Sequence, residues 1–339
     1  MMEYQMDEQN EKMLQWEGRI LKQDGICYLG YTNSALTVQV MGSRLEMYLL
    51  TGENEEVNQP GLRIYVDGVK ASEIVLKERE GWYTICDLDT KSIHEVCMVK
   101  ITEAAMSYVG LKEIRVTDGE LYPINQEDDR VKVEFIGDSI TCGYGVHGKP
   151  ESEYTIREED GECCYASFMA KEMNWNAHWI SASGYGMYVE YTGDPENNVP
   201  KLYPYVNWFV NPDVKQDMKE FEPKYIFVNL GTNDSGHLDK TEIREGFLKA
   251  YEEFLKLLRT CHPESVIVCV LGTLCEEVFP YVEQVVDTVK QQGMKNVYAF
   301  ELPYHNVELD GMASMHPSET THKKDAERIL AFMRGEGIL

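Results

Sequence analysis

The chain has 339 residues, of which 43% are hydrophobic, so it exceeds the usual size of one domain and can bury a sizeable core. Acidic residues outnumber basic ones by 58 to 32, a formal net charge of −26, which disfavours nucleic acid and anionic membrane surfaces as partners. No apolar run approaches the ~20 residues of a membrane span, and the polar, acidic N-terminus lacks the features of a secretory signal.

Nine cysteines occur without paired spacing and without a CxxC motif, which argues against a disulfide framework and against a structural zinc site. Several of them stand in apolar stretches such as "VIVCVLG", where cysteine acts as a small buried hydrophobe. We therefore expect a cytoplasmic protein with reduced thiols and no structural metal. The net charge makes a neutral substrate the easier fit.

Short alternating segments fill residues 18–121, as in "ALTVQV" and "RLEMYLL", with turn residues such as Asp67-Gly68 between them. No stretch among them has a convincing helical period. This pattern is typical of an antiparallel sandwich or jelly roll, and it predicts an N-terminal β domain at 1–125.

The polar stretch 124–130 precedes a change of period. Beyond it, continuous apolar segments ("VKVEFIG", "AHWISAS", "KYIFVNLG", "SVIVCVLG" and "NVYAFEL") alternate with amphipathic ones, the last three at 240–261, 276–293 and 318–335. Buried strands alternating with helices predict an α/β domain at 126–339, with a parallel sheet covered on both faces.

Glycine and polar residues follow these apolar segments, at the edge where the carboxyl ends of parallel strands meet. Ser139 follows one in "GDSIT", Asn233 follows another in "GTND", and Gly184 and Gly186 stand in "SGYG". Each could be an ordinary turn. Together they could supply a serine nucleophile, with the Ser139 N–H, a glycine N–H and the Asn233 amide as donors to an oxyanion.

A serine nucleophile needs a base, and His316 is the favoured candidate because it lies beyond the last apolar segment and just before the final helix. His305 also follows that segment, and His147 and His237 lie in loops as weaker candidates. His322 is expected inside the final helix, exposed to solvent. The other histidines lie in less suitable places: His94, His178 and His262.

Other catalytic motifs are missing from the sequence. There is no GxSxG nucleophile elbow, no phosphate loop GxxxxGK[ST], no HExxH and no complete GxGxxG after a strand. The sequence therefore gives no sign of a metal or an organic cofactor.

The motifs "GDSIT", "SGYG", "GTND" and the late "HP" resemble the four blocks of the SGNH, or GDSL, hydrolase superfamily over about residues 131–334. The stretch "FIGDSITCGYG" after a β-rich region is similar to the two-domain carbohydrate acetylesterases of the carbohydrate esterase family 2 type. The resemblance implies an N-terminal jelly roll and a C-terminal three-layer α/β/α, flavodoxin-like SGNH domain. It also implies a serine esterase that removes O-acetyl groups from plant polysaccharides or their oligosaccharides.

The resemblance assigns roles to residues at the matching positions. Ser139 would be the nucleophile and His316 the base, with Asn233 and either Gly184 or Gly186 as oxyanion donors. The sequence does not choose between the two glycines.

This chain departs from the superfamily pattern beside the histidine. Most SGNH enzymes have an aspartate three residues before it, where this sequence has Ala313, and the nearest upstream acid is Asp310. Some related acetylesterases use a Ser-His dyad in which a backbone carbonyl holds the ring. We therefore expect a dyad, with Asp310 as a minor alternative for orienting His316.

The segment 187–221 is long and rich in aromatic residues. Tyr191, Tyr205 and Trp208 could stack on sugar rings or simply pack the segment onto the sheet. Asp138, next to the nucleophile, is also a candidate contact to substrate.

The sequence thus predicts an acetylesterase whose partner is an acetylated xylan- or mannan-derived oligosaccharide. A lipase or thioesterase of the same superfamily is one alternative. A carbohydrate-binding protein with an inactive hydrolase domain is another, which the intact Ser139, Asn233 and His316 disfavour. The oligomeric state stays open, a homo-oligomer included.

Overall fold

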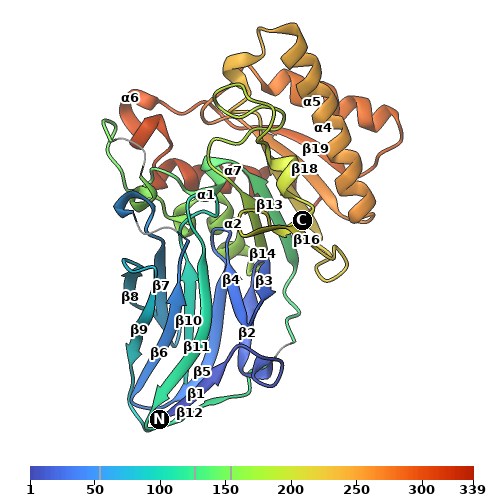
Figure 1. The fold of residues 1–339 in the computed structure, drawn as a ribbon. Helices are drawn as coiled ribbons and strands as arrows, with labels where there is room; N and C mark the ends of the chain where they lie inside the picture. Colours follow the sequence, from blue (N-terminus) through green and yellow to red (C-terminus); the bar gives the residue numbers. More distant parts are fainter. Residues whose placement is uncertain (53–54, 126, 153–154) are drawn as a thin grey trace. The chain divides into compact units, whose positions relative to one another are not determined.

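The computed structural model describes residues 1–339 except 53–54, 126 and 153–154 (Figure 1). Its internal contacts divide the chain into two compact units. The first unit comprises Met1–Asp129, Thr155–Arg157 and Val206–Pro212. The second unit comprises Arg130–Tyr154, Glu158–Tyr205 and Asp213–Leu339.

Two antiparallel sheets of six strands each form the first unit. One has the order β3-β4-β11-β6-β9 with β1 paired to β11, and the other has the order β12-β5-β10-β7-β8 with β2 paired to β5. The first sheet contains β1 (Met2–Gln5), β3 (Ile20–Gln23), β4 (Ile26–Leu29), β6 (Arg44–Leu50), β9 (Glu80–Asp87) and β11 (Val109–Thr117). The second contains β2 (Leu14–Glu17), β5 (Ala35–Met41), β7 (Gly61–Val66), β8 (Val69–Val75), β10 (His94–Lys100) and β12 (Glu120–Tyr122).

The alternating pattern of the sequence gives each sheet one apolar face. Leu36 and Val38 of β5 are fully buried in the same hydrophobic cluster as Leu45 and Met47 of β6, which belongs to the other sheet. Side chains of a strand alternate between the two faces of its sheet, so these faces pack together and the remaining positions face outward. The predicted antiparallel β sandwich is confirmed.

The second unit is built on a parallel sheet of five strands in the order β14-β13-β17-β18-β19 (Figure 1). These strands are β13 (Lys132–Gly137), β14 (Asn176–Ser181), β17 (Tyr225–Asn229), β18 (Val266–Leu271) and β19 (Val297–Glu301). In chain order this is the 2-1-3-4-5 arrangement of flavodoxin-like folds. The expected parallel sheet is confirmed.

Helices cover both faces of this sheet. The helices of the unit are α1 (Ser139–Cys142), α2 (Tyr165–Met173), α3 (Val199–Leu202), α4 (Thr241–Cys261), α5 (Phe279–Gln291), α6 (Val307–Asp310) and α7 (Glu319–Gly335). α2 and α7 pack together on one face, in a cluster with the aromatic side chains of β13 and β17. α4 and α5 pack side by side, and α5 also contacts β18 and β19. The three-layer architecture expected from the sequence is therefore present.

The aromatic-rich segment 187–221 holds α3 and a two-stranded sheet of β15 (Tyr205–Asn207) and β16 (Asn211–Lys215). One expectation about the second unit was wrong. His322 is fully buried rather than solvated. It lies on the same face of α7 as Ala326 and Ile329, the face that packs against α2.

Within the described part of the chain, no helix combines the length and the apolar character that crossing a membrane requires.

Candidate active site

Strand β13 ends at Gly137 and leads directly into the short helix α1, whose first residue is Ser139. The Asp138 carboxylate caps this helix by accepting a hydrogen bond of 3.0 Å from the Ile140 N–H. Gly143 closes the helix in the left-handed conformation, at φ 79°. The serine is thus placed at the carboxyl end of a central strand, on a backbone that is fixed on both sides.

Asp138 itself does not face solvent. Its exposed fraction is 0%, and burial raises the pKa of its carboxyl to about 7. The expected contact between Asp138 and substrate is not supported by this geometry, because capping α1 occupies the side chain inside the unit.

His316 reaches Ser139 from the other end of the unit's sequence. The Ser139 Oγ lies 2.7 Å from His316 Nε2, across 177 residues of chain. Ser139 is 6% exposed and His316 is half-buried, so the pair is largely shielded from solvent. This distance lets the Oγ–H donate to Nε2, the contact that a serine nucleophile and its base require.

The other ring nitrogen of His316 meets a backbone carbonyl. Its Nδ1 lies 3.2 Å from the Ser314 carbonyl oxygen, as expected for a dyad. Ser314 and Met315 both adopt left-handed backbone, at φ 51° and 66°, and this turn directs the carbonyl back toward the ring. The ring of Tyr144 packs edge-on against His316, with ring centroids 4.5 Å apart.

Asp310, the minor alternative for orienting His316, contacts other residues instead. Its carboxylate accepts hydrogen bonds from the hydroxyls of Ser318 and Thr321, at the start of α7. Ser318 is the N-cap of that helix, and its Oγ accepts from the Thr321 N–H. The Asp310 carboxylate therefore holds the N-terminus of α7, while the Ser314 carbonyl faces the His316 ring.

Burial, with a smaller contribution from the neighbouring His305, lowers the pKa of His316 to about 4, while the Ser314 and Ala313 carbonyls oppose the shift. A histidine with this pKa is neutral at neutral pH. It can therefore accept a proton from Ser139 without first losing one to solvent.

Asn233 and the "SGYG" segment lie beside this pair on neighbouring loops. The Asn233 amide donates a hydrogen bond of 3.0 Å from Nδ2 to the Tyr185 carbonyl, and the same nitrogen lies 3.5 Å from Asp138 Oδ2. These contacts join the loop after β17 to the loop after β14 and to the cap of α1. The strand-end residues singled out in the sequence are thus brought together.

The two glycines of "SGYG" have different surroundings. A Cβ on Gly186 would lie 2.1 Å from the Val189 carbonyl oxygen and 2.4 Å from Asp234 Oδ2, so Gly186 permits close packing inside the loop. Gly184 is partly exposed, has φ +81°, and has only the ring of Tyr191 near its Cβ position.

Asp234, the last residue of "GTND", organises this loop, and the sequence analysis assigned it no role. Its buried carboxylate accepts hydrogen bonds from the backbone N–H groups of Met187, Tyr188 and Val189, at 2.8, 2.9 and 2.9 Å. In the sequence, the signal for this role was that a carboxylate directly follows Asn233 in the same motif. Tyr144 also had no role in the sequence analysis, because no motif marks it, and His305 was considered there only as an alternative base.

The aromatic candidates are distributed between the units. Tyr191 is 68% exposed and its N–H donates to the Gly184 carbonyl, so it lies at the glycine segment. Tyr205 is half-buried and belongs to the second unit. Trp208 belongs to the first unit, through segment Val206–Pro212.

The remaining histidines have partners away from Ser139. His305 Nε2 donates to the Met315 carbonyl and His237 Nε2 donates to the Tyr191 carbonyl, both at 3.0 Å. His178 stacks on Phe221, and His262 lies 2.9 Å from the Tyr203 hydroxyl. His94 pairs with Asp67 in the first unit, at 2.7 Å.

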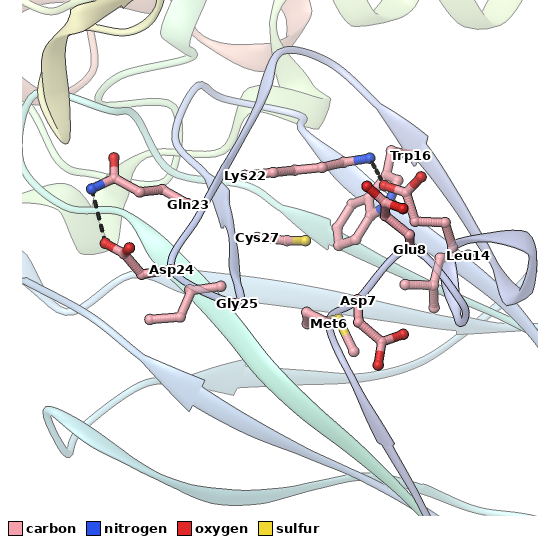
Figure 2. A pocket seen from close by; sticks show the side chains of 12 residues that line it. Met6, Asp7, Glu8, Leu14, Trp16, Lys22, Gln23, Asp24, Gly25 and Cys27 are labelled. Atoms are coloured by element: carbon pink, nitrogen blue, oxygen red, sulfur yellow. Dashed lines mark hydrogen bonds and ion pairs between the residues drawn. The ribbon is translucent and has the colours of Figure 1, made fainter.

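A pocket of about 480 Å³ lies in the first unit, between the β3–β4 hairpin and the segment from Met6 to Trp16 (Figure 2). Trp16 and Cys27 contribute apolar surface, and Lys22 and Glu11, which also line the pocket, form an ion pair. None of the site residues expected from the sequence lines it.

Side chains able to share a metal ion lie apart from the serine. Among the described residues, the His, Cys, Asp and Glu side chains that come close enough together are His147, Asp160 and Cys163. Ser139 and His316 are not among them.

Comparison with known proteins agrees with this geometry. Residues 135–324 match the GDSL-like Lipase/Acylhydrolase family, and residues 16–124 match the Carbohydrate esterase 2 N-terminal domain. The chain is 32% identical over 254 residues to Cellulase/esterase CelE of Acetivibrio thermocellus, covering 72% of this chain and 30% of CelE. It thus spans about a third of the length of that relative.

For two further similar proteins, the match covers most of both chains. An acetylxylan esterase / glucomannan deacetylase of Cellvibrio japonicus is 26% identical over 273 residues, covering 76% of this chain and 72% of that protein. The structure of a family two carbohydrate esterase from Clostridium thermocellum, in complex with cellohexaose, superimposes with a TM-score of 0.86 at 25% identity. That similarity covers 95% of this chain and 98% of the other.

Proposed function

The chain belongs to the GDSL-like lipase/acylhydrolase family, and we propose that it is a serine esterase that removes O-acetyl groups from carbohydrates. The observation that carries the proposal is the 2.7 Å contact between Ser139 Oγ and His316 Nε2 at the carboxyl end of the parallel sheet. The match of residues 16–124 to the Carbohydrate esterase 2 N-terminal domain supports a carbohydrate ester as substrate.

Acylation begins with proton transfer from Ser139 Oγ to His316 Nε2 as the oxygen attacks the acetyl carbonyl. The imidazolium that forms carries its other proton on Nδ1, which donates to the Ser314 carbonyl. A carbonyl fixes the tautomer and the ring orientation, although it stabilises positive charge less than a carboxylate would. The geometry therefore supports a Ser-His dyad.

Three donors are proposed to stabilise the oxyanion of the tetrahedral intermediate: the Ser139 N–H, a glycine N–H and the Asn233 amide. We assign the glycine role to Gly184, because it is partly exposed whereas Gly186 is packed against Asp234. The Asn233 amide nitrogen donates to the Tyr185 carbonyl at 3.0 Å, and its longer contact of 3.5 Å with Asp138 Oδ2 is the one that the oxyanion would replace.

His316 then donates its new proton to the leaving sugar hydroxyl, and the Ser139–acetyl bond remains. A water molecule gives its proton to His316 Nε2 and attacks the acetyl carbon, which releases acetate and restores the serine hydroxyl. Ser139, His316 and the three oxyanion donors carry the chemistry of this route.

The surface beside the serine suits a sugar. Tyr191 is 68% exposed and lies against Gly184, where its ring could stack on the apolar face of a pyranose. A neutral oligosaccharide is also not repelled by a chain with a net charge of −26. Acetylated xylo- and manno-oligosaccharides are therefore the proposed substrates.

The direct test measures acetate release from acetylated xylo- and manno-oligosaccharides, alongside 4-nitrophenyl esters of increasing acyl length. The proposal expects acetyl esters to be preferred and at least one of the oligosaccharides to be deacetylated. Hydrolysis of long-chain esters with none of the acetylated oligosaccharides would point instead to a lipase or thioesterase. Binding of oligosaccharides without any ester hydrolysis would indicate an inactive hydrolase domain.

Ser139→Ala tests the nucleophile in the same assay. The variant should keep its circular dichroism spectrum and lose activity by at least about 10⁴-fold, as removal of a serine nucleophile does elsewhere. Ser152→Ala is the matched control, since Ser152 lies in the loop that follows α1 and contacts the Lys149 N–H rather than His316. A folded Ser139→Ala variant with near wild-type turnover would refute the mechanism.

A further inference from the structure

His147, Asp160 and Cys163 converge on one point in the second unit, and neither Ser139 nor His316 belongs to this cluster. His147 Nε2 lies 2.8 Å from Asp160 Oδ2, and Cys163 Sγ lies 3.3 Å from the same oxygen. One donor atom of each residue lies within 4.8 Å of the other two. An imidazole, a carboxylate and a thiol therefore face each other although their positions in the sequence show no metal-binding motif.

The backbone fixes the position of each member of this cluster. The His147 N–H donates to the Glu158 carbonyl at 3.1 Å, and the Asp160 N–H donates to the Gly143 carbonyl at 3.1 Å. The second carboxylate oxygen of Asp160 accepts from the Glu162 N–H at 3.0 Å, which sets the orientation of its plane. Cys163 follows within the same 3₁₀ turn. The cluster is therefore arranged before any ligand arrives.

We propose that His147, Asp160 and Cys163 form a binding site for a divalent metal ion of the zinc class. Zinc takes imidazole nitrogen, thiolate sulfur and carboxylate oxygen at about 2.0–2.3 Å, which in tetrahedral geometry separates neighbouring ligand atoms by roughly 3.3–3.8 Å. The three donor atoms need only small side-chain adjustments from their present separations to reach that arrangement.

The burial pattern leaves one coordination position toward solvent. The Asp160 side chain is 0% exposed, while the His147 side chain is 49% exposed. Three protein ligands with one open side would place a water molecule in the fourth position. Binding releases the Cys163 thiol proton to the buffer, and the charges of thiolate and carboxylate then balance those of the divalent ion.

The thiol distinguishes this cluster from an ordinary ion pair. His94 and Asp67 in the first unit also form a histidine–aspartate pair, at 2.7 Å, and a second carboxylate, that of Asp89, lies 3.8 Å from the other ring nitrogen. That pair has no cysteine in reach among the described residues and is not a three-residue metal cluster. It provides a matched control for histidine–aspartate contacts on this acidic chain.

The position of the cluster suggests a stabilising role. Asp160 is tied to Gly143, which closes the helix that begins at Ser139, and His147 follows four residues later. A metal ion bound to the cluster would cross-link the two ends of segment 147–163. An ion that binds the folded chain better than the unfolded chain raises the free energy of unfolding.

The test titrates the whole chain with Zn²⁺ under a non-thiol reductant, and compares wild type with His147→Ala, Cys163→Ser and the control His94→Ala. Wild type and the control should bind one Zn²⁺ per chain and melt at a higher temperature in its presence. Both cluster variants should bind at least tenfold more weakly, and their melting temperature should respond less. His147→Ala provides a second readout if Cys163→Ser folds poorly, because about half of the His147 side chain is exposed.

Co²⁺ in place of Zn²⁺ reports on the ligands directly. A thiolate-to-cobalt charge-transfer band should appear in wild type and disappear in Cys163→Ser. Calorimetry in buffers of different ionisation enthalpy should show about one proton released per ion bound at neutral pH, from the thiol. Absence of stoichiometric binding in wild type, or equal binding by wild type and both cluster variants, would overturn the proposal.

Discussion

At the scale of single residues, the pairing of His316 with a backbone carbonyl is the central feature of the site. A carboxylate at Nδ1 would raise the pKa of the ring by stabilising the imidazolium, whereas here burial dominates and lowers the pKa of His316 to about 4. The neutral ring is thus available as a base at neutral pH. Its orientation depends on the left-handed turn at Ser314 and Met315.

The dyad predicts unequal effects for two substitutions near the ring. His316→Ala should reduce kcat by on the order of 10⁴-fold, because the base is lost. Asp310→Asn should reduce kcat by less than about tenfold, because Asp310 contacts Ser318 and Thr321 and an amide oxygen can replace one of those contacts. Steady-state kinetics on an acetyl ester measures both. A loss in Asp310→Asn as large as in His316→Ala would restore a catalytic triad.

His305 is predicted to position His316 through the same turn. Its Nε2 lies 3.0 Å from the Met315 carbonyl, and burial lowers its pKa, so the neutral ring donates this hydrogen bond. His305→Ala should lower kcat by roughly tenfold with little change in KM. The turn that carries His316 would be held less firmly, whereas the surface that contacts the substrate would be unchanged. His305→Gln keeps a donor and should recover much of the rate. Equal kcat values in all three proteins would exclude the positioning role.

At the scale of elements, the site is assembled by loops that follow parallel strands and pack on one another. The loop after α1 approaches the His316 turn so closely that a Cβ on Gly145 would lie 2.9 Å from the Ala313 carbonyl oxygen and 3.3 Å from the His316 Cβ. Gly145 also has φ +73°, which non-glycine residues seldom adopt. Close contact between these two loops therefore depends on a glycine.

Gly145→Ala should lower both stability and catalysis, and Gly337→Ala separates the two effects. Gly337 has a similar φ of +68° but no atom within 4 Å of its Cβ position. Both variants should lose roughly 1–3 kcal/mol of unfolding free energy from backbone strain. Only Gly145→Ala should lose kcat, by about tenfold or more, because it displaces His316. Chemical denaturation and kinetics give the two readouts, and matching kcat values in the two variants would contradict the loop contact.

At the scale of the whole molecule, buried histidines couple stability to pH. His322 is fully buried, its Nδ1 accepts a hydrogen bond of 3.2 Å from the Tyr165 N–H, and burial lowers its pKa to about 3. An unfolded chain regains the ordinary histidine pKa of about 6.5. Between these two values the unfolded state binds more protons, so stability is fully present above about pH 6.5 and falls as the pH drops toward 3.

Replacing His322 should therefore flatten the acid side of the stability curve. The slope of unfolding free energy against pH should be smaller in His322→Gln than in wild type by up to about 1.4 kcal/mol per pH unit between pH 3.5 and 6. Urea unfolding at several pH values measures this difference. Buried carboxyls such as Asp138 contribute equally to both proteins and cancel in the comparison. Parallel curves would show that His322 does not titrate differently on unfolding.

The sequence by itself determined the architecture and the set of strand-end residues, because both depend on periodic patterns. Alternating side chains in the first part must give sheets with one apolar face, as Leu36 and Val38 do. Continuous apolar strands separated by helices must run parallel, which brings the ends of β13 and β17 to one edge. Ser139 and Asn233 follow those strands, so their proximity was predictable without coordinates.

Only the tertiary structure decided what surrounds those residues, because the deciding contacts join segments far apart in the chain. The carbonyl at His316 depends on left-handed backbone at Ser314, a conformation that no motif marks. The different surroundings of Gly184 and Gly186 depend on where Asp234 lies. The sequence places His322 inside the final helix but does not show that it is buried, because its burial depends on α2 packing against that face of α7. Local sequence specifies periods and turns, whereas burial, dihedral strain and long-range hydrogen bonds are set only when the packed elements meet.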